Sequence, residues 1–189
     1  YHERDKTINW TPSHNLLNFL DRHSKILLLT FGSMINKDAV NTTKRFIDIF
    51  AQLGIPTIIN TAGGGLVRMD VNTDQILFVE NIPYEWILPK VYCALQHGGS
   101  GTVHMALKYG CSTMIIPHII DQYVWNDKIF QLGAGPKGVG INKIHSKKLI
   151  PLIKDLWSNE AYKSRAIEIS RQMQNEHLED DLYNFLVSQ

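Results

Sequence analysis

Cysteine is nearly absent from this sequence: only Cys93 and Cys111 occur among its 189 residues. The two are not spaced as metal ligands, and two cysteines do not make the disulfide framework that stabilises small secreted domains. The simplest expectation is therefore a protein of a reducing compartment, the cytoplasm.

Net charge is almost absent as well, because 19 Lys and Arg residues are balanced by 18 Asp and Glu residues to leave +1. Without a basic surplus, no broad face is expected to attract nucleic acid or an anionic membrane. Long apolar runs are also missing, since none approaches the roughly 20 residues that a membrane-spanning helix requires. We therefore expect no nucleic-acid partner and no integral membrane segment, and any anionic ligand must be held locally.

The first residues of the chain have neither an initiator Met nor the apolar core of a signal peptide. This favours a fragment or a processed piece of a longer protein. The polar segment 1–24 is predicted to lead in from a preceding domain. Residues 25–189 have a length that suits one globular domain with its own core.

Short β-rich runs alternate with helical stretches along most of the chain. Five runs have the apolar character of strands buried in a parallel sheet: 25–31, 56–61, 76–80, 92–96 and 113–116. Three stretches have helical spacing and end at a glycine: 39–53, 102–109 and 123–132. This order predicts an α/β fold, a Rossmann-like doubly wound parallel sheet.

The last part of the chain, 147–189, has the pattern of helical segments and no strand signal. It is predicted to form a helical C-terminal tail. Pro151 is expected to interrupt or shift the first of these helices, because proline lacks the backbone N–H that a helix interior uses.

The glycine-rich turn HGGSGT, at 97–102, follows a predicted strand and precedes a predicted helix that begins near Gly101. Glycines let the backbone approach an anion, and a helix N-terminus adds partial positive charge and free N–H groups. The turn is therefore a candidate phosphate site that needs no lysine. The plainer interpretation is that the glycines only make a tight turn and that His97 is structural.

Several phrases in fixed order resemble one family. IPYEWIL (82–88), QHGGSGT (96–102), IDQYVW (120–125) and GAGP (133–136) are similar to the IPHDWLF, HHGGAGT, GDQPFW and GVGP phrases of glycosyltransferases that use nucleotide sugars, most closely the sterol and lipid glucosyltransferase branch. WTP at 10–12, FGSM at 31–34 and TAGGGL at 61–66 extend the resemblance over most of residues 10–150. It implies the C-terminal half of a GT-B fold with two Rossmann-like domains.

The resemblance also implies roles for individual residues. The peptide at Ile82 would pair with the uracil edge, Asp121 and Gln122 would bind sugar hydroxyls, and Ser33 would reach the phosphates or the acceptor. The diphosphate would be held by a group of residues in the glycine-rich turn: His97, Gly99, Ser100, Gly101 and Thr102. Tyr84 stands where His is common, and Met105 replaces a Glu that contacts ribose in plant relatives, so the ribose contact is unassigned. Asp121 has a simpler interpretation as a helix cap.

The activity that the resemblance implies is inverting transfer of a hexose, glucose by preference, from a UDP-sugar to a hydroxyl of a lipid, sterol or other small acceptor. The catalytic base would be a His on a missing N-terminal acceptor domain, so no catalytic residue is assigned in this chain. No metal or other cofactor is expected, because no Asp-x-Asp motif is present. Peripheral contact with a membrane is left open.

Two other functions are kept as alternatives. The chain could be the non-catalytic nucleotide-sugar-binding half of a split enzyme, or part of a nucleotide-sugar epimerase with the same architecture. A dinucleotide dehydrogenase is disfavoured because TAGGGL lacks the G-x-G-x-x-G spacing. His104, His118 and His145 have no supporting partners in the sequence and are interpreted as structural or surface residues.

Overall fold

A parallel five-stranded sheet forms the centre of the computed structural model, which describes residues 10–175. Its strands are β1 (Leu27–Thr30), β2 (Thr57–Asn60), β3 (Ile76–Val79), β4 (Cys93–Gln96) and β5 (Ser112–Ile115). They lie in the order β3-β2-β1-β4-β5, with Leu27 of β1 opposite Thr57 on one side and Cys93 on the other. All five predicted strands are confirmed, and so is the doubly wound parallel sheet.

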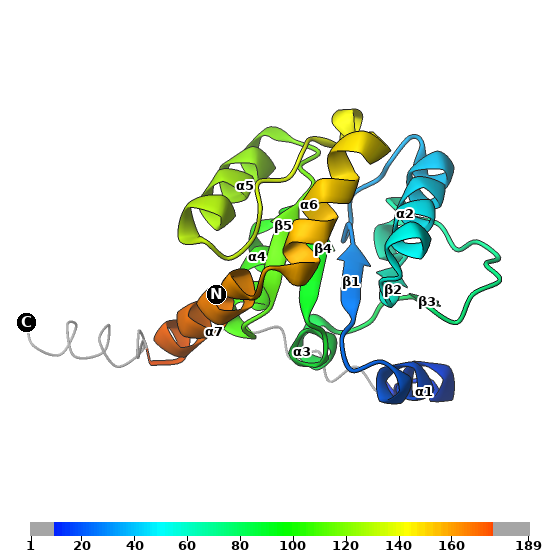
Figure 1. The fold of residues 1–189 in the computed structure, drawn as a ribbon, viewed down its shortest axis with the longest axis horizontal. Coiled ribbons are helices and arrows are strands. Elements are labelled where there is room, and N and C mark those ends of the chain that lie inside the picture. Colours follow the sequence, from blue (N-terminus) through cyan, green and yellow to red (C-terminus); the bar gives the residue numbers. More distant parts are fainter. Residues whose placement is uncertain (1–9, 176–189) are drawn as a thin grey trace, which may run out of the picture.

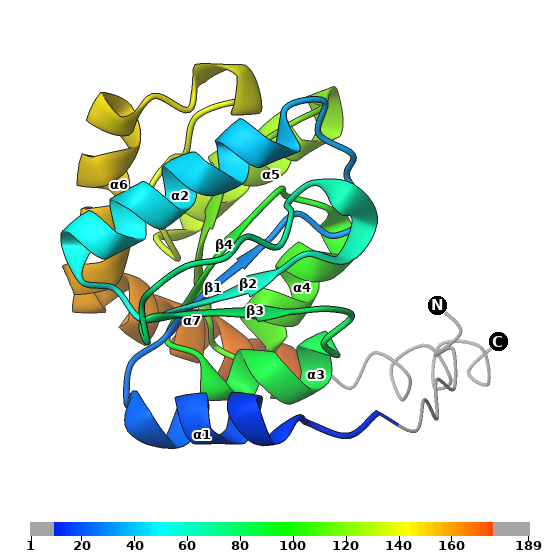
Figure 2. The same cartoon turned by 90° about the vertical axis from the view of Figure 1, so that its right-hand side faces the viewer.

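The helices cover both faces of this sheet (Figure 1). Figure 2 shows α2 (Ala39–Leu53) and α6 (Ser146–Ser158) on one face, with α1 (His14–Arg22), α3 (Tyr84–Ile87), α4 (Ser100–Lys108) and α7 (Glu160–Asn175) on the other. The remaining helix, α5 (Ile120–Leu132), follows β5 and packs against it. Strands β1, β2, β4 and β5 are buried along their whole length, which explains their continuous apolar runs.

Separate apolar clusters fill the two faces. Phe46 and Phe50 of α2 and Leu149 of α6 pack over one face of the sheet. Ile87 of α3 and Ala106 of α4 belong to the cluster on the opposite face. A third cluster joins α4, α5 and α7. The glycine-rich turn is thus held between a buried strand and a buried helix, which fixes where its backbone groups lie.

The predicted helices are present with small shifts at their starts. The stretch 39–53 is α2 with the same bounds, and Gly54 ends it in the left-handed conformation at φ +63°. Both α4 and α5 begin earlier than the predicted 102 and 123. The helical tail is confirmed as α6 and α7, and its part beyond Asn175 lies outside the described residues.

The prediction that Pro151 interrupts a helix is wrong. Pro151 lies inside the continuous helix α6. The helix loses one backbone hydrogen bond at this residue. Burial of Leu149, Ile153 and Leu156 against the sheet stabilises the helical conformation around it.

Segment 10–24 contains a helix that the sequence patterns did not predict. The hydroxyl of Ser13 caps α1 by accepting a hydrogen bond from the backbone N–H of Leu16 at 3.3 Å. Leu16 and Phe19 are buried in the same cluster as α3 and α4. This part of the segment therefore packs on the domain. No helix among residues 10–175 is long and apolar enough to cross a membrane.

Candidate functional site

Every predicted site residue lies in a loop or helix start at the carboxyl edge of the sheet, toward which the arrow of β1 points in Figure 1. Ser33 follows β1, Ile82 follows β3, the turn 97–102 follows β4, and the Asp121-Gln122 pair follows β5. The strand order reverses between β1 and β4, and in doubly wound sheets ligands bind outside this point. The predicted residues therefore surround one place in the fold.

The glycine-rich turn leads directly from β4 into α4. Gly98 has φ +98°, a backbone conformation that residues other than glycine rarely adopt. Gly99 is the N-cap of α4 and has an extended conformation. No side chain caps this helix. Its first N–H groups thus lack the side-chain acceptor that usually satisfies them, which leaves them available to an anion. Ser100 and Gly101 are exposed at this helix start.

The imidazole of His97 lies between two glycines from different loops. A Cβ atom on Gly99 would lie 2.5 Å from Nε2 of His97, and one on Gly32 would lie 2.8 Å from Cε1. Neither position leaves room for a side chain unless the ring moves. Gly32 follows β1 and Gly99 follows β4, so His97 fills the gap between the two loops at the switch point.

Burial keeps His97 neutral. The residue is only 6% exposed. Desolvation, with a smaller contribution from His118, lowers the pKa of His97 to about 4, against an opposing effect from the carboxylate of Asp121. Nδ1 of the ring has no hydrogen-bond partner among the described residues. The ring therefore offers one N–H donor and one acceptor rather than a positive charge.

Asp121 and Gln122 both lie in the first turn of α5 but in different surroundings. Asp121 is exposed, and it is not the helix cap, because Ile119 occupies that position. Gln122 is buried, and its Oε1 accepts hydrogen bonds from the backbone N–H groups of His118 at 2.7 Å and Ile119 at 3.3 Å. Of the pair, Asp121 is therefore the one with a free polar group facing solvent.

The peptide at Ile82 follows Asn81, which has a φ of +51°. Ile82 as a whole is buried, with its side chain in the core. A cavity of about 360 Å³ adjoins it, with Trp10, Arg68 and Glu80 in its lining. A ring-sized group has room beside this peptide.

Ser33 is exposed in the turn after β1. The TAGGGL loop packs closely against this turn, because a Cβ atom on Gly63 would lie 2.0 Å from the carbonyl oxygen of Gly32. This close backbone contact explains why the loop contains glycine there. The loop thus supports the turn that presents Ser33.

Tyr84 is a residue near the site to which sequence reasoning gave no role. Its hydroxyl lies 2.9 Å from Oγ1 of Thr30, at the end of β1. Nδ2 of Asn60, at the end of β2, donates to the same Thr30 oxygen at 3.3 Å. In the sequence, the only indication of this contact was that Thr30 and Asn60 are polar residues at the ends of otherwise apolar strands. The pKa of the Tyr84 hydroxyl is raised by burial, so it keeps its proton.

His118, which the sequence analysis interpreted as a structural or surface residue, lies beside the site. Its Nδ1 donates to the carbonyl of Ile116 at 2.9 Å, and its ring packs edge-on against Phe31. Desolvation lowers its pKa, and its Nε2 has no partner among the described residues. These contacts agree with a structural role beside His97.

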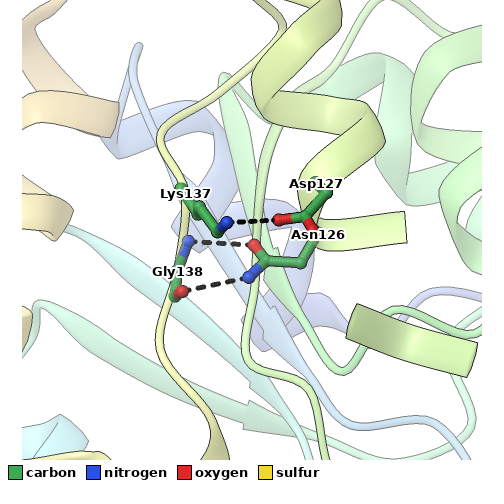
Figure 3. Close-up of polar contacts among 4 residues, drawn as sticks. All are labelled: Asn126, Asp127, Lys137 and Gly138. Atoms are coloured by element: carbon green, nitrogen blue, oxygen red, sulfur yellow. Dashed lines mark hydrogen bonds and ion pairs between the residues drawn. The ribbon is translucent and has the colours of Figure 1, made fainter. Parts of the chain in front are cut away.

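A polar clamp holds α5 to the loop that follows it (Figure 3). Nδ2 of Asn126 donates to the carbonyl of Gly138 at 3.0 Å, and the N–H of Gly138 donates to Oδ1 of Asn126 at 2.9 Å. Asp127 and Lys137 form an exposed ion pair next to it at 2.5 Å. Gly138 itself lies so close to β5 that a Cβ would be 1.9 Å from the carbonyl oxygen of Ile115. The clamp fixes the helix that carries Asp121.

Metal-ligating side chains do not gather at this edge. Among residues 10–175, no group of three or more His, Cys, Asp and Glu side chains is placed to hold a metal ion. The polar groups that the site offers are backbone N–H groups, hydroxyls, one neutral imidazole and one exposed carboxylate.

Comparison with known families gives one match over most of the chain. The sequence model described as "Erythromycin biosynthesis protein CIII-like, C-terminal domain" matches residues 49–184. The match contains the glycine-rich turn, the Asp121-Gln122 pair and the Asn126 clamp.

Sterol glucosyltransferases are similar in sequence. The chain is 29% identical over 168 residues to sterol 3-beta-glucosyltransferase UGT80B1 of Arabidopsis thaliana, covering 88% of this chain and 27% of that protein. It is 28% identical over 178 residues to sterol 3-beta-glucosyltransferase of Komagataella phaffii, covering 89% of this chain and 14% of that protein. The chain thus spans about a quarter or less of the length of these relatives.

Solved glycosyltransferases share the fold. Spinosyn forosaminyltransferase SpnP superposes with a TM-score of 0.72 at 15% identity, covering 91% of this chain and 46% of that one. The glycotransferase of kitacinnamycin superposes with a TM-score of 0.67 at 18% identity, covering 92% and 43%. The predicted GT-B-type Rossmann-like architecture is confirmed by these likenesses.

Proposed function

Because the chain belongs to the family of EryCIII-like C-terminal domains, we propose that it is the nucleotide-sugar-binding domain of a glycosyltransferase. The observation that carries this proposal is the turn from β4 into α4. It combines an uncapped helix start, two glycines that admit no side chain and a neutral buried imidazole at the switch point of the sheet. Such a site suits a diphosphate.

The site residues then have complementary tasks. The N–H groups and hydroxyls at Gly99, Ser100, Gly101 and Thr102 hold the diphosphate, together with one N–H of His97. As the bond from sugar to phosphate breaks, charge develops on the departing diphosphate, and preorganised donors stabilise it. No positively charged side chain is needed for this step.

The base and the sugar lie on either side of the diphosphate. The Ile82 peptide pairs with the base edge next to the neighbouring cavity, and Asp121 accepts hydrogen bonds from sugar hydroxyls. Gln122 is buried, its Oε1 accepts two backbone hydrogen bonds and its Nε2 donates one to Met34 Sδ at 3.5 Å, which leaves one amide hydrogen for a sugar hydroxyl. Ser33 faces the same edge from the other side of the switch point.

At finer detail, we propose UDP-glucose as donor and a sterol or other lipid hydroxyl as acceptor, because the relatives similar in sequence are named sterol 3-beta-glucosyltransferases. Transfer would invert the anomeric carbon, with the acceptor hydroxyl deprotonated by a base outside residues 10–175. The diphosphate donors of α4 would act without a metal ion.

Calorimetric titration of the chain with UDP, UDP-glucose and ADP, each in EDTA, tests the proposal. We expect micromolar to millimolar binding of both uridine nucleotides and at least tenfold weaker binding of ADP, which corresponds to about 1.4 kcal/mol. Absence of heat with any nucleotide, or binding of UDP only when magnesium is added, would contradict it.

A nucleotide-sugar-binding half without its own catalysis is a second candidate, because the site among residues 10–175 offers groups that bind a nucleotide sugar and no group to which the role of catalytic base is assigned. On this reading the chain binds UDP-glucose but transfers no glucose to a sterol. Turnover of radiolabelled UDP-glucose with a sterol, abolished by His97→Ala, would exclude this candidate.

A further inference from the structure

Apolar side chains are exposed together at the start of α5. Ile120 is the first residue of this helix and is 88% exposed, and Val124, one turn later, is 67% exposed. Ile119 and Tyr123, beside them, are half-exposed. These four residues are called the edge patch below. Single exposed apolar residues are ordinary, but a contiguous group of them marks a surface to which another molecule binds.

The loop after β1 brings a further exposed apolar residue close to the edge patch. Nε2 of Gln122, in the first turn of α5, donates to Sδ of Met34 at 3.5 Å, so this loop lies against the start of the helix. Ile35, the residue after Met34, is 80% exposed. The edge patch therefore lies beside the switch point of the sheet, where the donor site is assigned.

The exposed face of α5 is apolar only at its start. Lys128 and Gln131 follow Val124 at spacings of four and three residues, so they lie on the same face of the helix. Both are polar and exposed. The apolar part of this face is thus confined to the carboxyl edge of the sheet, next to Asp121.

We infer that the edge patch binds the apolar body of the acceptor, while Asp121 holds the sugar that the acceptor receives. This inference rests on the proposed function. For transfer, the acceptor hydroxyl must reach the anomeric carbon of the bound sugar, so the rest of the acceptor lies directly beside that sugar. Ile120 precedes Asp121 in the chain, and together they present an apolar and a polar contact at one place.

The carboxylate of Asp121 favours this occupant over a bilayer or another protein. A bilayer that took up Ile120 would also desolvate the neighbouring carboxylate, which is costly, and a net charge of +1 attracts anionic lipid only weakly. A protein that covered the edge patch would bury the same carboxylate, and aspartate is depleted from the centres of protein interfaces. A glycoside has both chemistries, hydroxyls for Asp121 and an apolar body for Ile120 and Val124.

Alkyl β-glucosides are the probes, because they join glucose to an apolar chain as the product of an inverting transfer from UDP-glucose does. Octyl and methyl β-glucoside are titrated against the chain saturated with UDP, below the micelle concentration of the octyl compound. We expect octyl β-glucoside to bind at least tenfold more tightly, which burial of about two methylene groups would provide.

Replacing Ile120 and Val124 together by serine should reduce this difference to less than threefold and leave the binding of UDP and methyl β-glucoside unchanged. Phe130→Ser removes another exposed apolar side chain, near the opposite end of α5, and is the matched control that should preserve the difference. Methyl resonances of the unsubstituted chain cover the case in which the double variant does not fold. Octyl β-glucoside should shift those of Ile120 and Val124 more than those of Ile167 on α7.

Equal affinities of octyl and methyl β-glucoside for the unsubstituted chain, or a difference that survives both serine substitutions, would overturn the inference. Binding to phosphatidylcholine vesicles, or self-association, that is lost in the double variant would also overturn it, because the edge patch would then contact a bilayer or a second copy of the chain. Failure of the proposed function is distinguishable, since it appears as absence of UDP binding by the unsubstituted chain, whereas failure of this inference leaves UDP binding intact.

Discussion

His97 is the residue whose chemistry depends most on its surroundings. An exposed histidine would be partly charged near neutral pH, but burial between Gly32 and Gly99 lowers the pKa of His97 to about 4. The ring can therefore donate to a phosphate without adding a charge of its own. The positive character of the site comes instead from the start of α4.

The lowered pKa of His97 predicts that the free energy of unfolding decreases as the pH is lowered. His97 takes up a proton near pH 6.5 in the unfolded chain and only near pH 4 in the folded chain. Its contribution to the free energy of unfolding is therefore fully present above pH 6.5 and is lost as the pH falls toward 4. The loss should approach about 3 kcal/mol, and burial of His118 acts in the same direction. Urea unfolding between pH 4.5 and 7.5 measures it. His97→Gln should flatten the slope, whereas a slope unchanged from that of the unsubstituted chain would contradict the account; exposed His145→Gln is the control.

Asp121 allows sugar binding to be separated from phosphate binding. Asp121→Ala should weaken UDP-glucose about tenfold while UDP stays within a few-fold, because only the sugar loses a charged acceptor. His97→Ala should weaken both ligands. Asp127→Asn changes a carboxylate on the same helix, within the ion pair to Lys137, and serves as the control in calorimetry. If Asp121→Ala weakens both ligands equally, or mainly lowers Tm, the sugar contact is wrongly assigned.

At the scale of elements, helix α5 depends on the Asn126 clamp. Asn126→Ala leaves both backbone groups of the buried Gly138 without their partners. We expect a loss of about 2–4 kcal/mol in the free energy of unfolding, measured by urea denaturation. Lys137→Ala removes only the exposed neighbouring ion pair and should cost about 0.5 kcal/mol or less. Equal effects of the two substitutions would show that the clamp does not hold the helix.

At the start of α4, one substitution is expected to raise the stability of the fold and to weaken UDP binding. A Cβ atom on Gly101 would meet nothing within 4 Å, so Gly101→Ala should not strain the fold, and alanine's helix propensity should add about 0.5 kcal/mol of stability. The same methyl group would stand where the diphosphate approaches and should weaken UDP about tenfold. Gly99→Ala, by contrast, meets His97 and should lower Tm. If Gly101→Ala binds UDP normally, the phosphate does not lie over this turn.

The sequence predicted those helices and strands whose positions are determined by their own residues and not by distant contacts. The apolar run at 25–31 is long enough to be buried on both faces, and Gly54 and Gly133 adopt the left-handed conformation that ends α2 and α5. The helix α1 was missed because the whole segment before β1 was interpreted as a polar entry, although Leu16, Phe19 and Leu20 have helical spacing and Ser13 is a suitable N-cap. Pro151 was misjudged because packing of the rest of α6 outweighs one lost hydrogen bond.

The site could be located from the sequence but not completed. HGGSGT between a strand and a helix predicts a turn with free N–H groups from its own residues. Tyr84 and Asn126, however, depend on partners far away in the sequence, Thr30 and Gly138, which only the fold brings close. Gln122 was assigned to sugar hydroxyls together with Asp121, but the sequence could not show that its Oε1 accepts from the backbone N–H groups of His118 and Ile119.

For the molecule as a whole, the sheet explains why residues from four loops act together. Parallel strands deliver all of their carboxyl ends to one edge, and the reversal of order between β1 and β4 opens a place for a ligand there. Base, diphosphate and sugar would then follow the edge from the loop after β3 to the start of α5. The apolar clusters on both faces of the sheet hold the strands in place and so fix the positions of these loops relative to one another.

The central claim is that a uridine diphosphate binds along this edge, and amide chemical shifts recorded during a titration with UDP test it most directly. We expect the largest changes at the amides of Gly99, Ser100 and Gly101, smaller ones near Ile82, and none at Cys93, which lies at the opposite end of β4. Changes centred on the amino ends of the strands, or no change at millimolar UDP, would contradict the account.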